Sequence, residues 1–161
     1  MDFEKRLQRA IERGEKARAA ADRVDAERHL SAEELRDVYS RGRLELSEHI
    51  EHCLRRLVNH FPGFNYASIL GDEGWGAKIT RDDLIARPGR PHETQYSRLE
   101  VFVTPRSTAS ILEVVCKGTI RNREAFHRRH FQRLIELDLQ AFNAQIDAWV
   151  LDYAEQFAAQ G

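Results

Sequence analysis

The chain has 161 residues, 42% of them hydrophobic and 32% charged, and its 25 basic and 26 acidic side chains leave a net charge of −1. This balance argues against a generally basic nucleic-acid binder and against an acidic disordered tail. No apolar run approaches the roughly 20 residues of a membrane helix, and the charged start lacks a signal-peptide core. We therefore expect a cytoplasmic protein, with one α+β domain over residues 1–161 and no membrane partner.

Residues 1–27 predict a helix with a heptad seam. Apolar and small residues recur at alternating spacings of four and three, the pattern by which helices pair. The middle of the seam holds only small side chains, which let a partner helix approach closely. The seam consists of Phe3, Leu7, Ala10, Gly14, Ala17, Ala21 and Val24. It predicts a homodimer, with an exposed alanine-rich helix on a self-contained monomer as the alternative.

Residues 31–61 predict a second helix. Ser31 and Glu34 have the spacing of a capping box at its start, and Pro62 ends it because the residue before a proline disfavours helical angles. Gly42 lies on the apolar stripe, where a small residue allows a close helix crossing. The stripe comprises Leu35, Val38, Tyr39, Leu46, Ile50, Cys53, Leu54, Leu57, Val58 and Phe61.

Residues 64–121 change to an alternating pattern and predict an antiparallel sheet. Four short strands joined in sequence indicate a meander packed on the long N- and C-terminal helices, with a loop of about 17 residues between the second and third strands. Phe102 and Val115 alternate with the inward residues. These two side chains, rimmed by charges, are candidates for a subunit or protein interface on the outer face.

Residues 123–159 predict one long C-terminal helix, with basic residues crowded at its start. Positive charge is unfavourable at a helix N-terminus, so it points to an anion nearby. The anion is either internal, such as Glu100 or Glu113, or external, such as phosphate, nucleic acid or an acidic protein. The candidate anion-binding residues are Arg121, Arg123, Arg128, Arg129 and Arg133.

A weak metal motif lies on the second predicted helix. His49 and His52 are three residues apart and His49 and Cys53 four apart, which places the side chains on one helical face. Histidine and cysteine together favour zinc. The order differs from the His-Glu-x-x-His motif of metalloproteases, and a solvated helix face is the alternative interpretation.

No further motif assigns chemistry to this chain. The two cysteines, Cys53 and Cys116, form no Cys-x-x-Cys pair, and neither a nucleophile elbow nor a glycine-rich phosphate loop occurs. We predict no catalytic residue and no cofactor, and the motifs resemble no family. The leading hypothesis is a non-enzymatic cytoplasmic interaction or assembly module that acts as a homodimer or larger homo-oligomer on a protein partner. The alternatives are an anion or nucleic-acid binder at the arginine cluster, and a metal-dependent enzyme that uses His49, His52 and Cys53.

Overall fold

The computed structural model describes residues 2–29 and 31–160 and, within them, every side chain except those of residues 26–29. The predicted helix 1–27 and the predicted domain 1–161 extend over residues 1, 30 or 161, which lie outside the described part. Contacts divide the chain into two units, Met1–Asp37 and Val38–Gly161. A single domain remains a prediction.

The first unit consists of helix α1 (Asp2–His29) and the first turns of helix α2 (Ala32–His60). The predicted helix at the N-terminus is therefore confirmed. Its large seam residues are exposed, with 64% of Phe3, 43% of Leu7 and 40% of Val24 accessible. At the start of α2, the backbone N–H of Glu34 donates to Ser31 Oγ at 3.1 Å. Ser31 therefore caps α2, as its spacing from Glu34 predicts.

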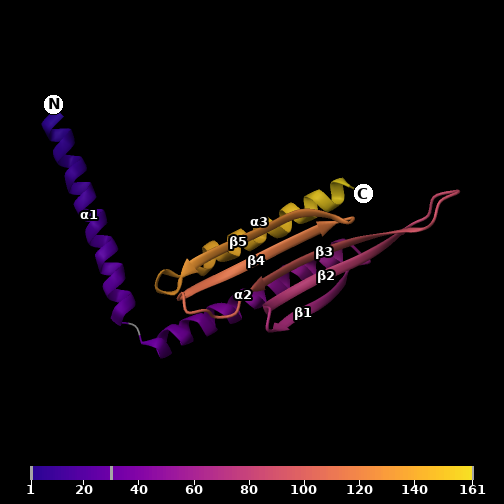
Figure 1. The fold of residues 1–161 in the computed structure, drawn as a ribbon, viewed down its shortest axis with the longest axis horizontal. Coiled ribbons are helices and arrows are strands. Elements are labelled where there is room, and N and C mark those ends of the chain that lie inside the picture. The colour runs from indigo at the N-terminus through magenta and orange to yellow at the C-terminus, as the bar shows by residue number, and fades with distance from the viewer. Residues whose placement is uncertain (1, 30, 161) are drawn as a thin grey trace. The chain divides into compact units, whose positions relative to one another are not determined.

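The second unit is built on one antiparallel meander in which neighbours in the chain are neighbours in the sheet (Figure 1). Its strands are β1 (Asn65–Gly71), β2 (Gly74–Ile85), β3 (Glu93–Val103), β4 (Ile111–Ile120) and β5 (Arg123–Arg133). A short 3₁₀ turn, η1 (Leu134–Glu136), leads to the last helix, α3 (Leu139–Ala159). The α+β class and the antiparallel sheet are confirmed.

The predicted sheet of four strands is wrong, because residues 123–133 form a fifth strand. Arg121 and Asn122 adopt positive φ angles of 49° and 70°, which is the conformation of a tight hairpin turn between antiparallel strands. The hairpin pairs β4 with β5 from Ile120 and Arg123 onward. The last helix begins only after Asp138, whose carboxylate caps it by accepting from Ala141 N at 3.1 Å.

The predicted long loop at residues 81–97 is also replaced by strand. Pairing between β2 and β3 continues without a break to Ile85 and Glu93. The Arg-Pro-Gly-Arg-Pro segment at residues 87–91 lies in the turn that joins the two strands. The charged residues before it alternate in exposure along β2, with Arg81 and Asp83 half-buried and Asp82 exposed, because successive side chains of a strand point to opposite faces.

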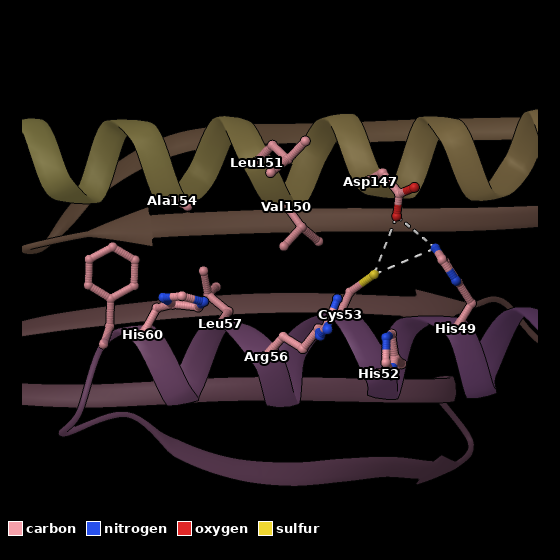
Figure 2. A pocket seen from close by; sticks show the side chains of 11 residues that line it. His49, His52, Cys53, Arg56, Leu57, His60, Asp147, Val150, Leu151 and Ala154 are labelled. Carbon is pink, nitrogen blue, oxygen red and sulfur yellow. Dashed lines mark hydrogen bonds and ion pairs between the residues drawn. The ribbon is translucent and has the colours of Figure 1, made fainter.

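Helices α2 and α3 lie side by side on one face of the sheet (Figures 1 and 2). The core between the helices and the sheet is apolar and tightly closed. Its fully buried members include Leu46, Ile50, Leu54, Val101, Val114, Phe142, Ile146 and Tyr153. Gly42 packs here too, since a Cβ at this residue would lie 2.9 Å from the side chain of Leu112. The sheet thus supports two helices whose facing flanks form the groove described next.

Candidate metal centre

Two side chains of α2 point across to α3. Ile50 and Leu54 are fully buried against the sheet, so His49 and Cys53, each one residue earlier, lie on the flank of the helix beside them. They are four residues apart and therefore stack on consecutive turns. Only 25% of the His49 side chain is accessible.

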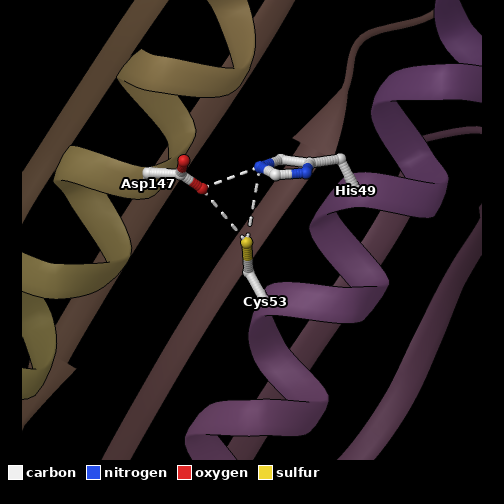
Figure 3. A group of neighbouring side chains, drawn as sticks. All are labelled: His49, Cys53 and Asp147. Carbon is white, nitrogen blue, oxygen red and sulfur yellow. Dashed lines mark hydrogen bonds and ion pairs between the residues drawn. The ribbon is translucent and has the colours of Figure 1, made fainter.

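Asp147 completes the cluster from α3. It follows the buried Ile146, so its carboxylate lies at the edge of the α3 apolar face, and half of its side chain is accessible. His49 Nε2 lies 2.7 Å from Asp147 Oδ1, and Cys53 Sγ lies 3.4 Å from the same oxygen. Cys53 Sγ and His49 Nε2 are 3.5 Å apart. Figure 3 shows the three donor atoms meeting in the space between the two helices.

The thiol of Cys53 is held in its neutral form. Burial, with a smaller contribution from the hydrogen bond to Asp147 and its negative charge, raises the pKa of Cys53 to about 12. The neutral thiol donates a hydrogen bond to the Asp147 carboxylate. Without a cation the group is therefore not an activated nucleophile, because a reactive cysteine needs a lowered pKa.

The geometry also differs from a cysteine–histidine–aspartate relay. In a relay, one ring nitrogen of the histidine faces the nucleophile and the other faces the carboxylate. Here the same atom, His49 Nε2, contacts both Cys53 and Asp147. The three side chains offer one nitrogen, one sulfur and one oxygen within 4.8 Å of one another, so they could together hold a cation.

Two of the three separations agree with those of a zinc ion bound by one sulfur, one nitrogen and one oxygen. Ordinary zinc–ligand lengths in a tetrahedron place the sulfur about 3.6 Å from the nitrogen and from the oxygen, and those two about 3.3 Å apart. The observed sulfur separations, 3.5 and 3.4 Å, are close to these values. The 2.7 Å contact between His49 and Asp147 must open by roughly 0.6 Å, which the half-accessible Asp147 side chain permits.

A groove continues from the cluster between the two helices. It has a volume of about 640 Å³. Beyond His49, Cys53 and Asp147, its walls are mainly apolar. One of these wall residues, Leu151, is 68% exposed to solvent. Figure 2 shows the donors at one end of the groove and Leu57, Val150 and Ala154 further along it. A metal ion held by these three residues would have space for a further ligand on the side of the groove.

The structure brings together two of the three residues in the predicted metal motif. His49 and Cys53 belong to the cluster, whereas His52 lines the groove without joining it. Asp147, which the sequence motif missed, supplies the third donor. No spacing rule connects positions 53 and 147; the available signal was an aspartate beside the apolar face of the last helix.

The predicted arginine cluster is distributed along a turn and a strand. Arg128 faces the helices and forms an ion pair with Asp152 at 2.9 Å, whereas Arg129 is 3.7 Å from Glu113 on the other face. Arg121 lies in the turn before β5, 5.7 Å from the ring centre of Phe157. Arg123 and Arg133 begin and end β5. An anion-binding role for the five arginines remains a prediction.

The interface candidates Phe102 and Val115 pair across β3 and β4 on the outer face of the sheet. They are only 8% and 2% accessible, and form a small cluster with Ile69. Lys117 extends over the Phe102 ring at 5.7 Å from its centre, which shows how the charged rim covers this apolar centre. Their role in an interface remains a prediction.

No protein-family model, no curated protein and no solved structure matches this chain. None of the helices, as far as the described residues extend, contains an apolar stretch long enough to cross a membrane.

Proposed function

We propose that this protein binds one zinc ion through His49, Cys53 and Asp147 and uses it as a metal-dependent enzyme. The observation that carries the proposal is the convergence of three different donor atoms, with separations of 2.7, 3.4 and 3.5 Å, from two helices. Structural zinc sites are closed by four protein ligands, whereas catalytic sites have three and an open position. The groove provides the space for that position.

The charges of the ligands support a divalent cation. Zinc binding displaces the proton of Cys53, so one thiolate and one carboxylate neutralise the two charges of the ion. The sulfur donor favours zinc over magnesium or calcium, which prefer oxygen ligands. An oxygen bound in the fourth position would be a water, which zinc activates as a nucleophile, or a substrate carbonyl, which zinc polarises.

Metal analysis tests the assignment. The untagged protein, purified without chelators, is expected to hold one zinc per chain, and His49→Ala, Cys53→Ala and Asp147→Ala each to lose it. His52→Ala is the matched control, because His52 lies on the same helix beside Cys53 but outside the cluster; it should retain the metal. Replacing zinc with cobalt(II) should produce a thiolate-to-cobalt charge-transfer band that Cys53→Ala lacks. Equal metal contents in wild type and Cys53→Ala would refute the site.

Self-association through α1 is a second candidate function. The observation that favours it is the exposure of Phe3, Leu7, Ile11 and Val24 on this helix, since exposed apolar seams are typical of pairing helices. Light scattering at micromolar concentration should give the mass of a dimer, and Leu7→Glu should give the mass of a monomer. A monomeric mass for the wild type would refute this candidate.

A further inference from the structure

The groove beside the candidate metal centre differs strongly between its two parts. The donor atoms of His49, Cys53 and Asp147 lie together at one end (Figure 2). The remaining walls are mainly apolar, with Leu57, Val150 and Ala154, and also include Arg56 and, at the far end, His60. From His49 to His60 the groove follows α2 for eleven residues, or about 16 Å at the ordinary rise of a helix. Its volume of about 640 Å³ lies within the range of small-molecule sites. The shape therefore fits a ligand with one polar end and a long apolar body.

The charge around the groove determines whether the polar end of the ligand should be anionic or cationic. Zinc with the ligands Cys53 and Asp147 has no net charge, because the thiolate and the carboxylate balance the ion. Arg56 lies on the groove wall, three residues after Cys53 on α2. A guanidinium beside a neutral metal centre favours an anionic oxygen donor over an amine.

We propose that the groove binds a carboxylate with an unbranched apolar chain. Its oxygen binds the zinc at the open position, Arg56 attracts its charge, and its chain lies against Leu57, Val150 and Ala154. This inference rests on the proposed zinc site, and names the class of molecule that the site takes.

Calorimetric titration of the zinc-loaded protein with octanoate and acetate tests the proposal. Each methylene removed from water strengthens binding by about fourfold. Octanoate has six more methylenes than acetate, and a groove open on one side covers about half of this surface. We therefore expect octanoate to bind about 60-fold more tightly than acetate. Heptylamine, which has the same six methylenes and the opposite charge, should bind at least tenfold more weakly than octanoate.

Two tryptophan variants separate the chain site from the metal site. Ala154→Trp fills the groove and should reduce octanoate affinity at least tenfold while the zinc content stays at one per chain. Ala148→Trp is the matched control, because Ala148 is exposed on the same helix and does not line the groove; it should bind octanoate like the wild type. Arg56→Ala should weaken octanoate binding about tenfold and leave zinc unchanged.

The outcomes distinguish this inference from the proposed function. If zinc binds at one per chain but octanoate binds no better than acetate, the ligand class is wrong and the zinc site stands. If octanoate binds equally well to zinc-free protein, the contact between its oxygen and the metal is wrong. If Ala154→Trp changes the oligomeric mass without changing octanoate binding, the groove is a subunit interface. A protein that binds no zinc refutes the proposed function itself, and this inference with it.

Discussion

Zinc should stabilise the folded protein, because its three proposed ligands come together only when the chain is folded. A ligand that binds only the folded state at 100 times its dissociation constant raises the free energy of unfolding by about 2.7 kcal/mol. For a chain of 161 residues, each kcal/mol raises the melting temperature by about 2–4 °C. The wild type should therefore melt about 5–10 °C higher in saturating zinc.

The arrangement of the ligands explains why zinc should bind the folded chain much more tightly than the unfolded chain. His49 and Cys53 are one helical turn apart, so an unfolded chain can still bring them to the same ion. Asp147 is 94 residues beyond Cys53 and reaches the site only when α2 and α3 pack on the sheet. Asp147→Asn should therefore lose most of the zinc-induced shift. Its metal-free stability should fall by less than about 1 kcal/mol, because Asp147 is half accessible.

Thermal unfolding with and without zinc provides the assay, after removal of bound metal with a chelator. His52→Ala is the control and should keep the full shift, since its side chain lies outside the cluster. An equal shift in wild type and Asp147→Asn would refute the reasoning, because zinc would then be stabilising the protein from another site.

Three predictions concern the fold that holds the site. Phe142→Ala should lower the free energy of unfolding by about 3–5 kcal/mol, because this side chain is fully buried; a loss below about 1.5 kcal/mol in urea unfolding would contradict its place in the core. Burial raises the pKa of Cys116 to about 12, so this thiol should react with a disulfide reagent at pH 8 only after denaturation. The hydrogen bond from Gln156 and the ion pair with Arg128 lower the pKa of Asp152 below its ordinary 3.8. The stabilising effect of the ionised Asp152 should be present above pH 3.8 and disappear as the pH falls through the folded-state pKa. Asp152→Asn should therefore be less stable than wild type at pH 7 by no more than a few tenths of a kcal/mol. A stability difference that grew towards acid pH would contradict this sign.

Much of the local structure could be predicted because its causes are local. The capping residues Ser31 and Glu34 determine where α2 begins, and Pro62 lies just beyond its end at His60. The apolar stripe of α2 correctly predicts the burial of Leu46, Ile50 and Leu54. The two helix ends depend on residues a few positions apart in the chain, and the apolar stripe depends on the helical repeat of 3.6 residues.

The fifth strand shows where local patterns were insufficient. The sequence pattern predicts that the basic residues between Arg123 and Arg133 begin a helix, where their charge indicates a nearby anion. As a strand, β5 alternates its side chains between two faces, so Arg128 and Arg129 point to opposite sides and contact different carboxylates. The positive φ angle of Arg121 is unusual for an arginine, whereas asparagine adopts such angles more readily at Asn122. No glycine indicates the turn.

By itself, the sequence determined the α+β class, the helical periodicity and the pairing of His49 with Cys53 on one flank of a helix, since all of these follow from spacing along the chain. Only the tertiary structure decided that Asp147, rather than His52, completes the cluster. The physical reason is that ligand convergence depends on how α2 and α3 pack across the sheet. That packing is determined by the buried residues on the neighbouring faces of both helices, and no spacing between positions 53 and 147 encodes it.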